Sequence, residues 1–214
     1  MISKTDELWH DLRVAVACVP IALLCMISVD ANAQGSGSRQ GGWASVALGY
    51  GSASVSCDSC RGPHRGGLDG LLGLGGTLNP HLRVGATWGL WTTGVDSIRD
   101  AGITTFTASL YYYPSARTGG WVDVGLGVSD YRVVKGQHNV FPFPTEQSTY
   151  AAGTGEGVEV GFGYEFPHTG SIAFAPHIQY AYGIVGQLHN NIGGMVAQGW
   201  KQSVFSLTVQ MDVH

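Results

Sequence analysis

The sequence predicts an all-β protein, an eight-stranded antiparallel up-and-down transmembrane β-barrel preceded by a cleavable signal peptide. Three observations lead to this prediction. Residues 42–213 contain eight runs in which apolar residues alternate with small or polar residues. The links between these runs are alternately short and long. The non-apolar side of each run is rich in glycine, serine and threonine, whereas a strand surface that faces water is usually rich in lysine and glutamate.

Residues 1–33 are typical of an export signal. They have a positively charged start, an apolar stretch at 14–29 and an A-x-A cleavage site at Ala31-Asn32-Ala33. The apolar stretch is shorter than the about 20 residues that a membrane-spanning helix needs. We therefore expect cleavage after Ala33, which leaves residues 34–214 as a single β-barrel domain.

Four runs in the first half of the exported chain have the period of two that is typical of β-strands. In the third run, Leu82 and Val84 alternate with Arg83 and Gly85, and the pattern continues to Thr92. The predicted strands of this half are residues 42–51, 68–78, 82–92 and 102–113.

The second half contains four more runs of the same kind. The clearest places Val124 and Leu126 on one face, with Asp123 and Gly125 on the other. Most runs are longer than the about 5–6 residues of an average strand and match the about 9–11 residues of a tilted membrane strand. The predicted strands of this half are residues 120–134, 155–166, 171–184 and 200–213.

The links alternate strictly between long and short along the chain. The short links contain turn residues such as Asn79-Pro80-His81 and lie at 79–81, 114–119 and 167–170. The long links lie at 52–67, 93–101, 135–154 and 185–199. Outer-membrane barrels have short periplasmic turns and longer external loops, and an even strand number returns both termini to the periplasmic side.

The two faces of each strand are assigned from composition. Residues 34–214 contain only the lysines Lys135 and Lys201, so we expect the apolar face to meet lipid and the small residues to fill the narrow lumen. The charged and amide side chains predicted on the lumen face are Asp69, Arg83, Asp123, Glu159, Glu165, His177 and Gln179. Aromatic residues near the strand ends predict two interfacial girdles: Tyr112, Trp121, Tyr164, Phe166 and Phe174 near the short turns, and Tyr50, Trp88, Tyr182 and Trp200 near the long loops. A secreted soluble barrel that binds a small apolar ligand remains an alternative.

With strands, turns and girdles assigned, residues 43–214 resemble the small outer-membrane β-barrel proteins of the OmpA/OmpX-like superfamily. The resemblance implies export through the inner membrane of a Gram-negative bacterium and insertion into its outer membrane by the barrel assembly machinery. It also implies contact with outer-membrane lipid and lipopolysaccharide, and we expect a monomer. Family members usually end on an aromatic residue that the insertion machinery recognises, whereas this chain ends on His214.

Cys57-Asp58-Ser59-Cys60 lies in the first long link. Outside the cytoplasm a close cysteine pair is most often a disulfide, which here would staple the loop. A metal site and a redox pair remain open alternatives. Haem attachment would need histidine directly after Cys60, where Arg61 stands, and zinc would need further ligands beyond His64.

The sequence predicts no catalytic residues, no cofactor site and no metal site, so we expect a non-enzymatic protein with a structural, surface-interaction or minor-permeability role. A formal net charge of −4 gives no basis for nucleic-acid binding. The alternative is a lipid-modifying barrel enzyme, for which His64, Asp96 and Ser97 are the available loop residues. The third long link contains aromatic and proline residues at 138–144. We expect them to pack on the barrel rim, and an adhesive surface is the alternative interpretation.

Overall fold

The structure is a computed structural model, and it describes residues 41–96, 99–115, 118–135, 149–166 and 171–213. The chain divides into two compact units, Met1–Gly35 and Ser36–His214, and all described residues belong to the second. The predicted signal peptide and His214 lie outside the described residues. Within the described residues, no helix is long and apolar enough to cross a membrane.

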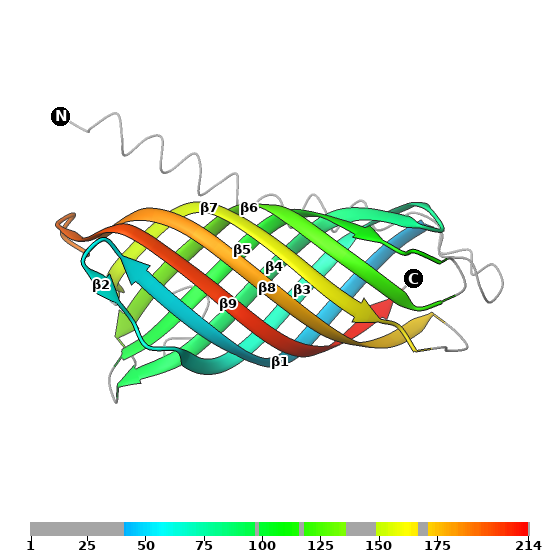
Figure 1. Cartoon of the computed structure of the whole chain (residues 1–214), viewed down its shortest axis with the longest axis horizontal. Coiled ribbons are helices and arrows are strands. Elements are labelled where there is room, and N and C mark those ends of the chain that lie inside the picture. Colours follow the sequence, from blue (N-terminus) through cyan, green and yellow to red (C-terminus); the bar gives the residue numbers. More distant parts are fainter. Residues whose placement is uncertain (1–40, 97–98, 116–117, 136–148, 167–170, 214) are drawn as a thin grey trace. The chain divides into compact units, whose positions relative to one another are not determined.

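Eight long strands and one two-residue strand form a single antiparallel sheet (Figure 1). The elements are β1 (Gly41–Cys57), β2 (Cys60–Arg61), β3 (Arg65–Asn79), β4 (Leu82–Asp96), β5 (Arg99–Tyr112), β6 (Gly120–Lys135), β7 (Thr149–Tyr164), β8 (Ile172–His189) and β9 (Met195–Val213). Each long strand pairs with the next along the chain, and β2 pairs with the end of β1. The order confirms the predicted up-and-down topology.

The first and last long strands close the sheet into a barrel. Their ladder runs from Ala44 opposite Val213 to Ser56 opposite Lys201. Closure leaves no long edge with unpaired backbone groups, which is the condition for a sheet to span lipid. The predicted eight-stranded barrel is therefore confirmed.

The strands extend further than predicted at one end of the barrel, which we call the rim and which carries β2. Strand β1 runs to Cys57 instead of residue 51, and β9 starts at Met195 instead of residue 200. The described parts of the segments expected to be long loops are thus largely paired strands. Their outward residues, such as Ser52 and Ser54, are polar, so the apolar alternation stops although the ladder continues.

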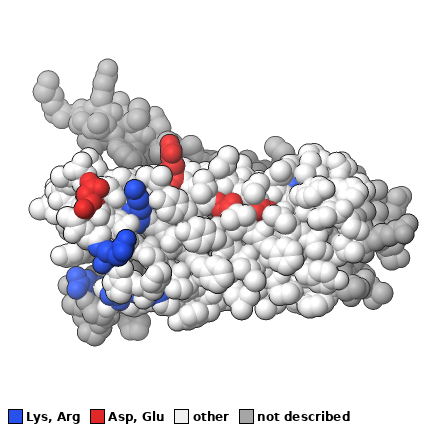
Figure 2. Space-filling view, in the orientation of Figure 1, with Lys and Arg blue, Asp and Glu red and all other residues white. Residues whose placement is uncertain are grey.

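An apolar band covers the outside of the barrel below the rim. Its residues are exposed and large, for example Leu48 at 71%, Leu126 at 69% and Val209 at 62%. Figure 2 shows this face almost free of charged side chains, with most of the visible charges toward the end that carries β2. The prediction that the apolar face of each strand points out of the barrel is confirmed.

Replacing Leu126 by arginine is expected to destabilise the barrel in lipid vesicles by about 2–4 kcal/mol, because a charge near the middle of the band must enter hydrocarbon. Ser54→Arg is the matched control, since Ser54 also points outward but pairs with Ser203 at the rim, beyond the band. It should cost only about 0–1 kcal/mol. Urea unfolding followed by tryptophan fluorescence measures both costs, and equal costs would contradict a lipid-facing band.

Candidate functional site: the filled barrel interior and the charged rim

All seven side chains that the sequence predicts on the lumen face are buried in the barrel. They are Asp69, Arg83, Asp123, Glu159, Glu165, His177 and Gln179, each exposed by 6% or less. The alternation of the strands places them there, because their outward neighbours occupy the lipid face. Six of them come from five different strands and Glu165 directly follows β7, so together they form parts of a continuous polar interior.

An ion pair lies at the end of the barrel opposite the rim, which we call the turn end. Arg83 on β4 pairs with Glu165, with 3.2 Å between Nη1 and Oε1. The Tyr113 hydroxyl donates to the same carboxylate oxygen at 2.6 Å and accepts from Arg83 Nη1 at 2.8 Å. The guanidinium also lies 4.9 Å from the Tyr113 ring centroid. The cluster joins three segments that are distant in sequence.

Four rings cross the lumen next to this ion pair. Trp43 and Tyr111 meet edge to face at 5.0 Å between centroids, Tyr111 and Trp121 at 5.3 Å, and Trp121 and His177 at 4.8 Å. The prediction that Trp121 belongs to the outer girdle is wrong, because it is only 1% exposed. It shares the inward face of β6 with Asp123, and position near a strand end alone does not reveal the face.

Hydroxyl, amide and carboxyl groups fill the middle of the barrel. Glu159 accepts hydrogen bonds from Thr107 at 2.6 Å, from Ser109 at 3.0 Å and from Gln179 at 3.0 Å. His177 Nε2 lies 3.2 Å from Asp123 Oδ1. A Cβ atom at Gly161 would overlap both members of this pair, so glycine provides the space that they occupy.

An apolar plug fills the lumen at the rim. Its buried residues are Ala53, Trp91, Ala101, Ile103, Tyr131, Val185, Leu188, Trp200 and Val204. Trp91 Nε1 donates to the carbonyl oxygen of Gly51 at 3.1 Å, and the Trp200 ring lies 4.6 Å from that of Tyr131. The prediction that Trp200 belongs to the outer girdle is therefore wrong. At this height the barrel is apolar inside and polar outside, the reverse of its membrane section.

Charged side chains surround the plug at the rim. The described ones are Asp58, Arg61, Arg65, Arg99, Asp100, Asp130, Arg132, Glu156 and Lys201. Lys201 and Arg61 both lie opposite Ser56, one on each side of it, so they belong to one row across β9, β1 and β2. On β6, Arg132 Nε donates to Asp130 Oδ2 at 2.6 Å. The rim thus carries exposed cations next to the edge of the apolar band.

The predicted disulfide between Cys57 and Cys60 is present, with 4.9 Å between the Cα atoms. It closes the turn between β1 and β2, so the pair lies at the tip of a hairpin instead of inside a long loop. Cys57 packs against the apolar plug, and the Asp58 amide donates to the Gln198 carbonyl at 3.1 Å. Gly199 has φ of 67° and gives the Asp58 carboxylate room, because a Cβ atom there would overlap it.

Replacing both cysteines by serine is expected to loosen this hairpin tip while the barrel stays folded. The loop is short, so the chain-entropy effect of the disulfide is about 2 kcal/mol at most, and the ladders on either side persist. Hydrogen exchange measures the change, with faster exchange expected at the Asp58 amide and unchanged exchange at Val124 in the membrane section. Uniformly faster exchange along β1, β6 and β9 would show a global role instead.

The other predicted candidates are not brought together in the described part of the chain. His64 is exposed between β2 and β3. Asp96 ends β4, and Ser97 lies outside the described residues, as do the aromatic and proline residues at 138–144. Among the described residues, no three His, Cys, Asp or Glu side chains are grouped to hold a metal ion.

The apolar plug is the feature that the sequence reasoning missed. The sequence does contain an indication of it, because toward the rim the large apolar residues move from the outward positions of each strand to the inward positions. In β4 the lipid-facing series ends at Leu90 and the next residue, Trp91, points inward. In β5, Ala101 and Ile103 likewise occupy positions of the face that carries Thr105 and Thr107 nearer the membrane.

No protein-family model matches the chain, and no curated protein matches it in sequence. Solved structures do match. Neisserial surface protein A is 15% identical, with a TM-score of 0.53, and the match covers 81% of this chain and 99% of that protein. The Yersinia pestis attachment invasion locus protein Ail, in complex with the heparin analogue sucrose octasulfate, is also 15% identical, with a TM-score of 0.50 and coverages of 80% and 99%. The chain therefore has the fold of the small outer-membrane β-barrels, as its resemblance to the OmpA/OmpX-like superfamily predicted.

Proposed function

We propose that this protein is a non-enzymatic barrel of the bacterial outer membrane, in which the filled membrane section is an anchor and the charged rim binds the anionic saccharide and phosphate groups of lipopolysaccharide. Insertion by the barrel assembly machinery and a monomeric state are parts of this proposal. The observation that carries it is the distribution of cations. Apart from Arg83, every described lysine and arginine lies at the rim, at or beyond the edge of the apolar band.

Lys201 and Arg61 are the cations best placed for such a contact. Both are exposed and both flank Ser56 in the row just above the apolar band. The phosphates of lipopolysaccharide lie where hydrocarbon meets the saccharide, which is the height of this row. The complex of Ail with a heparin analogue supports the same chemistry, because that ligand is an anionic saccharide bound by a barrel of this fold.

The binding test uses the refolded full barrel in detergent micelles that contain lipopolysaccharide. Each cation near an anionic lipid surface is worth about 1 kcal/mol, so Arg61→Gln with Lys201→Gln should weaken binding about thirtyfold. Glu156→Gln is the control, because it removes a rim charge of the opposite sign and should not weaken binding. Unchanged affinity of the double variant, or affinity that does not fall with added salt, would contradict the proposal.

The filled lumen gives a second test. Side chains fill the barrel interior, and the cavity beside Asp69 has a volume of about 10 Å³, which is room for about one water molecule. We expect planar bilayers that contain the protein to show no stable conductance steps. Large and persistent channels would favour a permeability role over the anchor role. Incubation with lipid A or phospholipid should give no product by mass spectrometry, and any product would favour the lipid-modifying enzyme.

A further inference from the structure

Among the described residues, more acidic than basic side chains are buried in the lumen of the membrane section. Five carboxyl side chains are buried among the described residues, namely Asp69, Asp123, Glu159, Glu165 and Asp212. The basic side chains buried in the same described part of the chain are Arg83 and His177. An ionised group is destabilised when it leaves water for a poorly polarisable interior, unless it is paired. The lumen therefore has a place for additional positive charge.

Four of the five carboxyl groups have strong partners. Glu165 binds Arg83 and Tyr113, and Glu159 accepts three hydrogen bonds. Asp123 contacts His177, and both oxygens of Asp212 accept from Gln210. The fifth group, Asp69, differs from the other four.

Asp69 has one oxygen without a partner. The Ser206 hydroxyl is within hydrogen-bonding reach of its carboxyl group. Its Oδ2 atom, however, accepts no hydrogen bond from the described residues, although the side chain is only 6% exposed. Arg83 lies opposite Thr77 on the same strand as Asp69, eight residues away, which is about 26 Å at 3.3 Å per residue.

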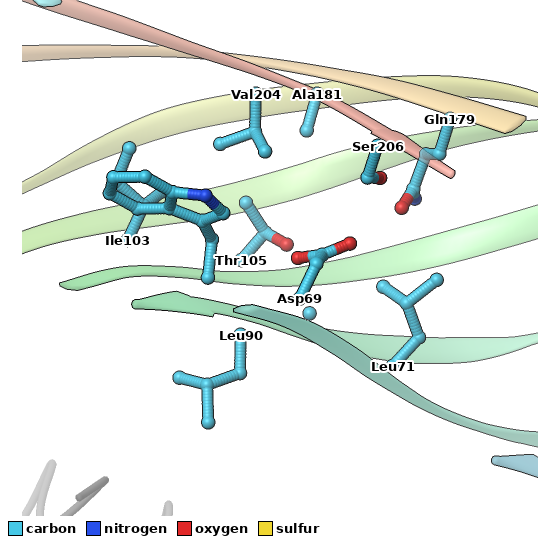
Figure 3. A pocket seen from close by; sticks show the side chains of 11 residues that line it. Asp69, Leu71, Leu90, Ile103, Thr105, Gln179, Ala181, Val204 and Ser206 are labelled. Atoms are coloured by element: carbon cyan, nitrogen blue, oxygen red, sulfur yellow. The ribbon is translucent and has the colours of Figure 1, made fainter. Parts of the chain in front are cut away.

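Asp69 points into a cavity of about 10 Å³, which Figure 3 shows from close by. Three of the residues around it carry side-chain oxygens: Thr105, Gln179 and Ser206. Apolar residues, including Trp91 and Ile103 of the plug, form the rest of the wall. Glycine at position 89 keeps the space open, because a Cβ atom there would come within 2.5 Å of Thr105 Oγ1 and 3.2 Å of Leu71.

We propose that this cavity binds one small monovalent cation of the sodium type, with Asp69 Oδ2 as the charged ligand and the neutral oxygens around it as the others. All candidate ligands are oxygens, which hard cations prefer. A divalent ion fits poorly, because calcium takes six to eight oxygens and only one carboxylate lines the space. The bound ion supplies positive charge next to Asp69, because Arg83 is too distant and the His177 ring, which also acts electrostatically on Asp69, is paired with Asp123. The site is independent of the rim and of its proposed ligand.

The test compares the unfolding midpoint temperature of the refolded barrel in sodium chloride and in choline chloride of equal ionic strength, read from heat-modifiability on gels. Ligand linkage predicts a rise of about 5–10 °C when sodium reaches about one hundred times its dissociation constant. Asp69→Asn should abolish this dependence and should exceed the wild type in choline chloride, where its neutral amide needs no ion. Glu156→Gln, an exposed rim variant, should keep the full dependence.

Other outcomes overturn the site. Equal midpoints in the two salts would mean that the cavity holds only water. A midpoint that responds to pH but not to sodium would mean that a proton neutralises Asp69. A sodium dependence that survives Asp69→Asn would place the ion elsewhere. Thr105→Val provides a second variant that keeps the shape of the side chain, and it should shift the sodium response to concentrations at least tenfold higher.

Discussion

Replacing Arg83 by methionine is expected to destabilise the barrel by about 3–5 kcal/mol, the range observed when one partner of a buried ion pair is removed. Methionine fills a similar elongated space but supplies no charge and no hydrogen-bond donor. Glu165, which is 5% exposed, then loses the Arg83 guanidinium and keeps the hydrogen bond from the Tyr113 hydroxyl. Urea unfolding in lipid vesicles, followed by tryptophan fluorescence, gives the free energy of unfolding.

The reciprocal variant should cost less. In Glu165→Gln the amide oxygen can still accept from Arg83 and Tyr113, so only the charge is lost. Asp212 shares a small recess with Arg83 and continues to attract the guanidinium. We expect a cost of about 1–2 kcal/mol, which is the range for a hydrogen bond weakened by the loss of one charge.

The double variant Arg83→Met with Glu165→Gln separates pairing from packing. It should be more stable than Arg83→Met alone, because a neutral amide replaces the buried carboxylate that has lost the Arg83 guanidinium. Tyr113→Phe serves as a packing control, since it keeps the ring over the guanidinium and removes only the hydroxyl. If Arg83→Met and Glu165→Gln lower the free energy of unfolding equally, the positive charge of Arg83 is not needed to stabilise the buried carboxylates.

The fold follows from the sequence because the two faces of each membrane strand contact different media. Val124 and Leu126 meet lipid while Asp123 meets the lumen, so the alternation itself encodes the barrel and its inside. The same periodicity predicted that Glu159, His177 and Gln179 point inward. Their partners could not be predicted, because the register between strands decides that Gln179 reaches Glu159 and that His177 reaches Asp123.

The rim was predicted less well because the surrounding medium changes there. Above the apolar band the outer face meets water and the inner face forms an apolar core, so the alternation inverts and is interrupted by serine and glycine. Trp200 shows the ambiguity, since an aromatic residue near a strand end fits either an outer girdle or an inner plug. Leu90 is the last large apolar residue that points outward on β4, and Trp91 points into the plug. This change of face could be predicted only from the position at which the membrane section ends.

Replacing Trp91 by alanine is expected to cost about 3–5 kcal/mol, because it removes one of the two tryptophan side chains of the apolar plug and leaves a cavity. Trp91 is 3% exposed and packs against the backbone of two adjacent strands, where glycines at positions 51 and 67 allow the close approach. Its indole also loses the hydrogen bond to the Gly51 carbonyl. Urea unfolding in vesicles measures the cost.

Trp88→Ala is the matched control on the same strand. Trp88 lies in the outward series of β4, so mobile lipid chains can fill the space that its removal leaves, and only the transfer free energy is lost. We expect Trp91→Ala to cost clearly more than Trp88→Ala, and equal costs would mean that the plug is not tightly packed. Bilayers with Trp91→Ala should still show no conductance, because Trp43, Tyr111 and Trp121 continue to close the lumen at the turn end. A channel that opened in this variant would instead make the plug the sole barrier to ions, and the anchor would become a gated pore.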